Sequence, residues 1–258
     1  MTSALRNTLT VWYALILREA LDRLFDMRGA WFWLLAEPAM HILFMSFIRV
    51  VIRMRTVANA DALMWIVVGM LAFFLFRRTA VQVTHAVDSN RAFFAFRQVQ
   101  PFDPALARAV LEAFLMAIVA IIILVATSFF DRQIIPDDPL LVLAAVLGLW
   151  LFGLGYGLVA SVLQNLIPEM KHVLKILMMP LYLISGVIIP LSSIPQPYLS
   201  WLMYNPIAHA LELVRLGYFE HYHTVPGVSM GYVYAWSVAS ICLGLLLYRR
   251  FAIQLTMR

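Results

Sequence analysis

Three long stretches of the chain contain no charged residue. They are residues 140–167, 228–248 and 113–130, with 28, 21 and 18 residues. About 20 consecutive apolar residues cross the hydrocarbon core of a bilayer as a helix, and a longer stretch crosses with tilt. The pattern therefore predicts three transmembrane helices.

Three further apolar stretches are interrupted by charged or helix-breaking residues. They are residues 30–48 with Glu37, Pro38 and His41, residues 62–86 with Arg77 and Arg78, and residues 176–194 with Pro180, Gly186 and Pro190. We interpret these as spans too. The sequence thus predicts an all-α polytopic membrane protein with six transmembrane helices and both termini on the same side.

The composition agrees with a chain that lies mostly in the membrane. Of the 258 residues, 63% are hydrophobic and 13% are charged, whereas about 25% are charged in a typical soluble domain. Six or seven spans of about 20 residues fill this length and leave no room for a soluble catalytic domain. The sequence shows no internal repeat or domain boundary, so residues 1–258 are interpreted as a single transmembrane domain.

The basic residues predict the orientation. If the termini are cytoplasmic, twelve of the 19 basic residues lie in the cytoplasm: Arg6, Arg18, Arg23, Arg28, Arg91, Arg97, Arg108, Lys171, Lys175, Arg249, Arg250 and Arg258. Four lie outside (Arg53, Arg55, Arg132 and Arg215), and Arg49, Arg77 and Arg78 fall within spans. Cytoplasmic loops of membrane proteins are enriched in Lys and Arg. The pattern favours N-in and C-in, and the net charge of +5 is not interpreted as nucleic-acid binding.

Two segments outside the simple spans are also predicted to contact the membrane. In residues 1–29, Leu5, Leu9, Trp12, Ile16 and Leu24 form an apolar face, and the pairs Arg18–Asp22 and Glu19–Arg23 lie on the other face. This pattern is typical of a helix in the cytoplasmic interface.

Residues 190–227 are uncharged as far as Ala208 but contain Pro190, Pro195, Pro197 and Pro206. A straight span does not accommodate these prolines, so we expect a re-entrant helical hairpin on the outer side. Asn205 and Pro206 predict the start of a helix, as N-cap and first helical residue. Ile207, Leu211, Val214 and Tyr218 would form one face of that helix, and His209, Glu212 and Arg215 another.

Several chemistries are argued against. The only lysines, Lys171 and Lys175, do not follow glycine, so the chain has no phosphate-binding loop of the Gly-Lys type. It has no HExxH or CxxC motif, and because Cys242 is its single cysteine, no disulfide within the chain is expected. The run Glu220–His223 is interpreted as a polar loop, and Ser185 has no histidine in its span. Gly153, Gly155 and Gly157 predict close helix packing.

Three patches of residues resemble one family: the permease subunits of ABC exporters that move polysaccharide, in particular the capsular-polysaccharide (KpsM-type) branch. The patches are Arg28, Gly29, Trp33, Glu37 and Pro38; Asn90, Arg91, Phe94, Arg97, Val99, Pro101, Asp103, Arg108 and Glu112; and Asn205, Pro206, His209, Glu212 and Arg215. The resemblance covers the whole chain. Gln100 departs from it, since a lysine is expected there.

The resemblance implies a type-2 ABC exporter permease architecture in the inner membrane of a bacterium. It implies a homodimer on two copies of a cytoplasmic ATPase, which binds the ATP and Mg, with no cofactor and no catalysis on this chain. A glycan path would lie between the two copies. In Gram-negative hosts, periplasmic and outer-membrane export proteins would continue the path.

Residues 87–104 are expected to be the segment that couples to the ATPase, through aromatic and arginine anchors. The candidates are Asn90, Arg91, Phe93, Phe94, Phe96, Arg97, Pro101 and Asp103. The alternative is an interfacial loop that rests on lipid.

The glycan path is expected to combine arginines for an acidic polymer with aromatic rings for its sugars. The candidates are Trp33, Arg49, Trp65, Phe73, Phe76, Arg77, Arg78, Tyr182, Trp201 and Tyr204. The alternatives are ion pairs with Glu37 or Glu112 for the arginines, and interfacial anchoring for the aromatic residues.

The outer segment supplies the candidate gate residues Asn205, Pro206, His209, Glu212 and Arg215. For Glu212 and Arg215 the alternative is an ion pair that stiffens the outer helix. Two other functions stay open at this point: a permease for O-antigen or teichoic acid, and a membrane-embedded enzyme that modifies glycans, such as an acyltransferase. A permease for drugs or lipids is disfavoured by the cytoplasmic segment and by Arg77 and Arg78.

Overall fold

The computed structural model describes residues 2–25, 30–51, 56–95, 99–129 and 134–257. Its long helices are α1 (Thr2–Phe25), α2 (Ala30–Val51), α3 (Ala62–Thr84), α5 (Phe102–Ser128), α6 (Pro139–Leu166), α7 (Met170–Ile184), α9 (Pro206–Tyr218) and α10 (Met230–Arg250). Its short elements are β1 (Thr56–Val57), β2 (Ala60–Asp61), α4 (Ala86–Ser89), η1 (Arg91–Ala95), η2 (Leu191–Ser193), α8 (Tyr198–Leu202) and α11 (Ala252–Met257).

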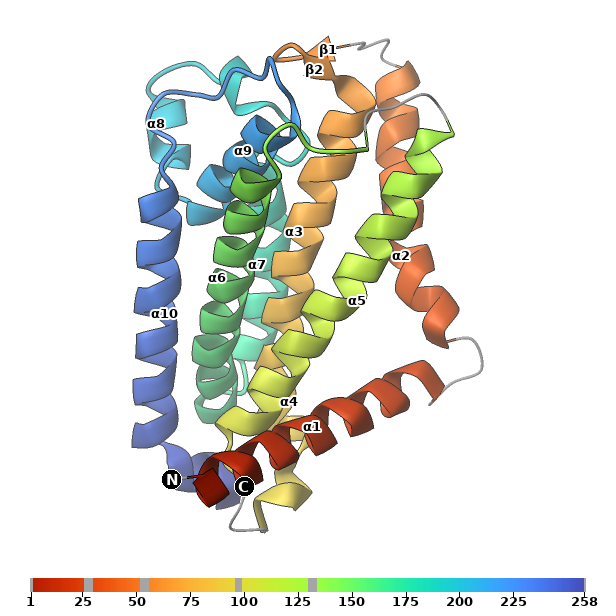
Figure 1. Cartoon of the computed structure of the whole chain (residues 1–258). Coiled ribbons are helices and arrows are strands. Elements are labelled where there is room, and N and C mark those ends of the chain that lie inside the picture. The colour runs from red at the N-terminus through yellow and green to blue at the C-terminus, as the bar shows by residue number, and fades with distance from the viewer. Residues whose placement is uncertain (1, 26–29, 52–55, 96–98, 130–133, 258) are drawn as a thin grey trace.

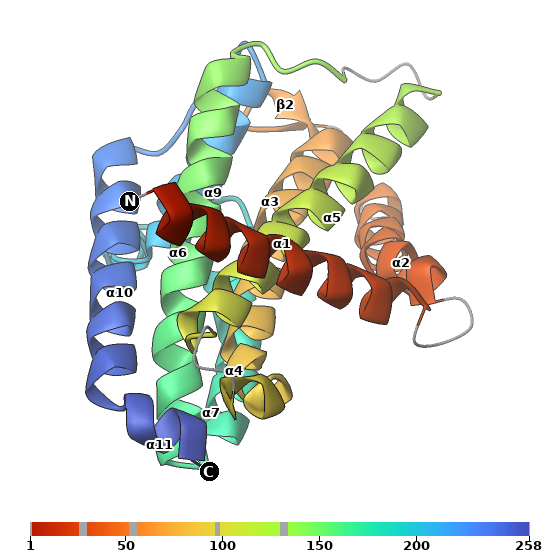
Figure 2. The same cartoon turned by 60° about the horizontal axis from the view of Figure 1, so that its bottom comes forward.

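The long helices form a bundle with two different ends (Figure 1). Both termini, α4 and the crossing helix α1 lie at one end, and Figure 2 shows α1 lying across it. The β1–β2 hairpin, α8 and α9 lie at the opposite end. We call these the terminal end and the hairpin end.

Helix α3 is the centre of the bundle. Within the described residues, four helices are long and apolar enough to cross a membrane, namely α3, α5, α6 and α10. In an apolar stretch of 18 residues within α3, 83% of the residues are buried inside the protein, compared with 17% in such a stretch of α10. Asp61 caps the start of α3, where its carboxylate accepts a hydrogen bond from the Met64 N–H at 3.0 Å. Side chains on α3 therefore face protein on nearly all sides.

Two of the predicted spans differ most from the helices of the structure in their bounds. Residues 113–130 were expected to form a span, but α5 begins eleven residues earlier, at Phe102, and so carries Arg108 and Glu112. Residues 176–194 were expected to form another, but α7 covers Met170–Ile184. Its 15 residues span about 22 Å, less than the hydrocarbon core of about 30 Å. It ends because Gly186 has a φ of +74°, whereas residues in an α-helix have a φ of about −63°.

The glycine series of α6 packs as the sequence predicts. A Cβ on Gly153 would lie 3.1 Å from the Phe76 carbonyl oxygen, and one on Gly157 would lie 2.6 Å from the Val83 Cβ, both on α3. A Cβ on Gly155 would lie 2.2 Å from the Ser240 Oγ on α10. The alternate glycines thus let α6 approach α3 on one side and α10 on the other.

Helix α1 forms both predicted ion pairs, but one of them is buried. The pairs Arg18–Asp22 and Glu19–Arg23 both form, at 3.3 Å. However, Glu19 is buried. The Glu19–Arg23 pair faces the protein rather than solvent, because carboxylate and guanidinium groups of α3 and α5 neutralise it there.

Candidate functional site

The five predicted gate residues lie together at the hairpin end, inside the protein. Glu212 and Arg215 on α9 are 1% and 0% exposed, and their side chains pair at 3.3 Å. Arg215 also donates hydrogen bonds to the carbonyl oxygens of Gly186 at 2.9 Å and Val187 at 3.3 Å. A buried guanidinium needs such partners because it cannot lose its proton.

The Glu212 carboxylate has a second partner. The Tyr222 hydroxyl lies 3.0 and 3.1 Å from its two oxygens, and the Trp65 Nε1–H donates to that hydroxyl at 3.3 Å. The cluster therefore ties α9 to α3, to the turn after α7 and to the loop after α9. This arrangement corresponds to the stiffening ion pair that the sequence left as an alternative to a gate.

The other gate candidates also brace this end. Asn205 caps α9, with its oxygen accepting from the Ile207 N–H at 3.0 Å and its amide donating to the Ser185 Oγ at 2.8 Å. Pro206 occupies the first turn, as predicted. His209 bridges the Met203 carbonyl at 2.7 Å and the Ser229 N–H at 3.1 Å. Its two ring nitrogens thus hold the segments before and after α9 in place.

The candidate coupling segment lies at the terminal end and is held by α1. The Arg18 Nη1 donates to the Asn90 side-chain oxygen at 3.0 Å, and the Arg18 guanidinium lies 4.2 Å from the centre of the Phe93 ring. Arg91 donates to Asp88 at 2.7 Å and to Asn165 at 2.9 Å. Asn90 is buried, so it shapes the segment from within.

The second half of the coupling segment is also hydrogen-bonded to α1. The Asp103 carboxylate accepts hydrogen bonds from the Trp12 Nε1–H at 2.8 Å and from the Gln100 N–H at 2.7 Å, and it is buried. Pro101 is half-buried just before α5, and Phe93 and Phe94 are half-buried on η1. Phe96 and Arg97 lie outside the described residues. Of the described candidates, Arg91, Phe93, Phe94 and Pro101 remain partly accessible to a partner.

Arg77 and Arg78 are neighbours on α3 but have different surroundings. The Arg78 Nε lies 3.2 Å from a Glu112 oxygen, and its Nη1 lies 3.9 Å from Glu37. Glu112 is fully buried and also pairs with Arg23. Arg77 lies 4.0 Å from Glu37. The predicted alternative, pairing with Glu37 or Glu112, therefore holds closely for Arg78 and, at 4.0 Å, for Arg77.

A larger charge network surrounds Glu112, and sequence reasoning missed it. The Arg108 Nε lies 2.8 Å from a Glu19 oxygen, and Arg23 joins Glu19 to Glu112. The network fastens α1 to α3 and α5. The signal was present: Arg108 and Glu112 stand four residues apart before a long apolar run, a spacing that puts them on one helix face.

The aromatic path candidates separate into two groups. Trp65, Phe73 and Phe76 are 0%, 1% and 0% exposed, so no glycan touches them in this arrangement of helices. Trp33, Trp201 and Tyr204 are exposed. Tyr182 is half-buried, its hydroxyl 3.1 Å from the His41 Nε2. The side chain of Arg49 lies outside the described residues. The sequence did not indicate this burial, because it depends on the central position of α3, which a run of apolar residues alone does not reveal.

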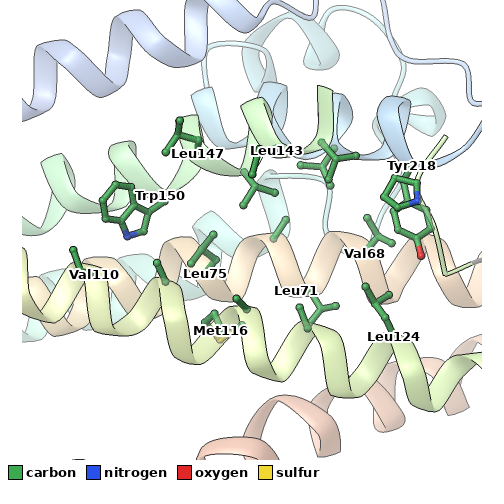
Figure 3. A pocket seen from close by; sticks show the side chains of 18 residues that line it. Val68, Leu71, Leu75, Val110, Met116, Leu124, Leu143, Leu147, Trp150 and Tyr218 are labelled. Atoms are coloured by element: carbon green, nitrogen blue, oxygen red, sulfur yellow. The ribbon is translucent and has the colours of Figure 1, made fainter. Parts of the chain in front are cut away.

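A large apolar cavity of about 440 Å³ lies between α3, α5 and α6 (Figure 3). Leu71, Met116, Leu143 and Trp150 are among its lining residues, and none of the predicted path residues is. It has no charged side chain to bind an acidic polymer. Among the described residues no group of three His, Cys, Asp or Glu side chains suits a metal ion, and Glu220 and His221 are exposed in their loop.

The chain is similar to members of one known family of transporters. Residues 10–219 match the ABC-2 type transporter family. The chain is 34% identical over 240 residues to the polysialic acid transport protein KpsM of Escherichia coli, covering 92% of this chain and 91% of that protein.

Two further relatives cover a similar share. The chain is 26% identical over 242 residues to the capsule polysaccharide export inner-membrane protein CtrC of Neisseria meningitidis, covering 93% of this chain and 90% of that protein. It is 23% identical over 239 residues to BexB of Haemophilus influenzae, another capsule polysaccharide export inner-membrane protein, with the same coverage. The chain therefore belongs to the ABC-2 type transporter family, as a non-catalytic membrane subunit of a bacterial inner-membrane transporter.

Proposed function

We propose that this chain is the permease subunit of an ATP-driven exporter that moves capsular polysaccharide from the cytoplasm across the inner membrane. The observation that carries the proposal is the similarity to KpsM, CtrC and BexB over at least nine-tenths of each chain. The buried outer cluster and the helical bundle suit a transport scaffold, and ATP and Mg would be bound by a separate ATPase subunit.

The proposed topology has six spans with N-in and C-in orientation. The four helices that qualify by length and composition are joined by α2, which has 22 residues, and by α7 together with the segment after it. Both termini, α1 and the coupling segment lie at one end (Figure 1), which would face the cytoplasm. Residues 190–227, with η2, α8 and α9, would form the re-entrant outer segment.

The functional unit would be a homodimer with the glycan path between its copies. Helix α7 supports this, because none of its described residues is buried and Ile176 and Met179 are each 71% exposed. Helix α2 also exposes Phe44 and Phe47. These faces would meet the second copy, and Trp33, Arg77, Tyr182, Trp201 and Tyr204 would line the path.

The coupling segment would bind one of two ATPase copies. Arg91, Phe93 and Phe94 are its accessible described anchors, backed by Arg18 and Asp103. Movements of the ATPase would reach α5 through Asp103 and α1 through Arg18, because both contacts join the segment to the bundle. Periplasmic and outer-membrane export proteins would receive the polymer beyond the membrane.

The test is the location of the surface polysaccharide after deletion of this gene in its host. Polymer trapped inside the cell with synthesis intact, and restored to the surface by the wild-type gene, is expected. A normal surface polymer would contradict the proposed cargo. The cargo would then have to be inferred from the ATPase that co-purifies with the chain.

A further inference from the structure

A polar cavity of about 370 Å³ lies between α3, α6 and α7. Its polar lining residues are Arg77, Thr84, His85, Tyr156, Gln164, Lys171 and Lys175. His85 follows the last residue of α3, and Lys171 lies in the first turn of α7. The cavity therefore sits at the terminal end of the bundle.

The charged residues that line this cavity are all positive. Arg77, Lys171 and Lys175 are cations, and no lining residue is a carboxylate, although Asp88, outside the lining, accepts a hydrogen bond from the Gln164 Nε2 at 3.0 Å. Among the described residues neither lysine has a carboxylate within 4.0 Å, and Arg77 reaches only Glu37, at 4.0 Å. Arg78, next in the chain, is neutralised by Glu112 at 3.2 Å. A close carboxylate thus compensates Arg78, whereas Arg77 has one only at 4.0 Å and the two lysines of the cavity have none this close among the described residues.

A second, independent observation is the Tyr156 hydroxyl. Its oxygen is buried and has no hydrogen-bond partner among the described residues, and Tyr156 is one of the residues that line the cavity. Buried polar groups in proteins are nearly always hydrogen-bonded, so an exception needs an explanation. A ligand oxygen in the cavity would supply the missing acceptor.

The surroundings of His85 are also affected by the positive charge of the lining. Burial, and then the charge of Lys171, lower the pKa of His85 below its ordinary value, although Asp88 acts in the opposite direction. A neutral imidazole can still donate one hydrogen bond to an anion. The lining of the cavity therefore offers cations and neutral donors together.

The geometry points to a binding site for a phosphate group, in which Arg77, Lys171 and Lys175 supply the charge and the Tyr156 hydroxyl donates a hydrogen bond. Phosphate oxygens accept charge-assisted hydrogen bonds from Arg and Lys, and basic pockets between transmembrane helices on the cytoplasmic side hold lipid head groups. The phosphate would come from a membrane phospholipid or from the lipid-linked end of the exported glycan. This inference rests on the proposed function only for its cytoplasmic orientation and for the second source.

The test measures lipid binding to the purified complex of this chain with its ATPase, by native mass spectrometry. The probe is dioleoylphosphatidylglycerol, and dioleoylglycerol, with the same acyl chains and no phosphate, is the reference. We expect the phosphate-bearing lipid alone to bind to the wild type. In the K171Q/K175Q variant its affinity should fall at least about tenfold, since each charged hydrogen bond is worth about 1.5 kcal/mol or more.

The matched control is R249Q/R250Q, which removes two exposed charges near the same end of the bundle, on α10. It is expected to bind like the wild type. Tyr156→Phe removes only the hydroxyl and should weaken binding at least about tenfold, because the lost hydrogen bond has a charged phosphate acceptor. It also keeps the test decisive if K171Q/K175Q does not assemble. Unchanged binding in Tyr156→Phe and K171Q/K175Q, or an equal loss in R249Q/R250Q, would overturn the site.

Competition by glycerol phosphate separates the two sources. If it displaces the lipid, the phosphate alone suffices and the end of the glycan fits the site. If it does not, the site holds a phospholipid head group with its chains. Both results support a phosphate site. The readout here is lipid binding and not export. A normal surface polymer after gene deletion would therefore overturn the proposed cargo but not the phosphate site.

Discussion

The Arg215 guanidinium lies against the indole of Trp65, 3.5 Å from the ring centre. The contact is possible because Gly69, one turn further along α3, has no side chain: a Cβ there would be 2.2 Å from the Arg215 Nη2. Together with Glu212 and the Gly186 carbonyl, Trp65 encloses a charge that is 0% exposed. A cation buried this completely makes the outer cluster a structural joint, and most predictions about it concern stability.

Glu212→Gln should destabilise the protein. The substitution leaves the buried Arg215 charge without its counter-ion, which costs about 3–5 kcal/mol. The thermal midpoint of the detergent-solubilised complex and the yield of complex with the ATPase should both fall. Glu220→Gln, in an exposed position eight residues later, is the control and should change neither. Lost export with an unchanged midpoint would instead assign Glu212 to a gate.

Gly155→Ala should loosen the contact between α6 and α10. The new Cβ would lie 2.2 Å from the Ser240 Oγ and 2.7 Å from the Ile241 backbone nitrogen, and overpacking of this kind costs about 1–3 kcal/mol. The expected result is a lower thermal midpoint. Gly231→Ala, whose Cβ would meet only the Ser229 Oγ at 3.7 Å, should not lower it. Equal midpoints for the two variants would contradict the helix packing.

Arg18→Ala should weaken coupling without unfolding the bundle. The variant loses the hydrogen bond to Asn90 and the contact with the Phe93 ring, so η1 is no longer held in position. Retention of the ATPase on the purified chain should fall roughly tenfold, the effect of one charged hydrogen bond. Arg249→Ala, an exposed residue at the end of α10, is the control. Full retention in Arg18→Ala would show that the segment holds its shape unaided.

Trp12 and Asp103 should be energetically coupled. The hydrogen bond between them, 2.8 Å long, involves a charged acceptor and is worth about 1.5–3 kcal/mol. A double-mutant cycle with Trp12→Phe and Asp103→Ala, read from thermal unfolding, should show that the double variant loses less stability than the sum of the single variants. Additive losses would mean that the bond between Trp12 and Asp103 adds nothing to the Glu19–Arg108 and Arg23–Glu112 contacts between α1 and α5.

Local patterns in the sequence determined the helices and several of their details. The uncharged runs predicted α6 and α10, and Asn205 and Pro206 predicted the start of α9. The glycine series predicted close packing of α6, and the three patches led to the transporter family. These features depend on residues close together in the chain, or on backbone preferences of single residue types, and so can be inferred without knowing the fold.

The surroundings of each side chain were decided by the tertiary structure alone. Arg77 and Arg78 are consecutive, yet one lines a basic cavity and the other binds Glu112, because successive residues on a helix point about 100° apart and different helices pack on the two sides of α3. Trp65 and Trp33 have the same chemistry, but only Trp65 is covered, by the contacts of α9 and its loop. In a chain that is apolar almost throughout, hydrophobicity identifies the spans but does not distinguish protein-facing from lipid-facing positions, since both are apolar. The packing of α3 at the centre supplied that distinction.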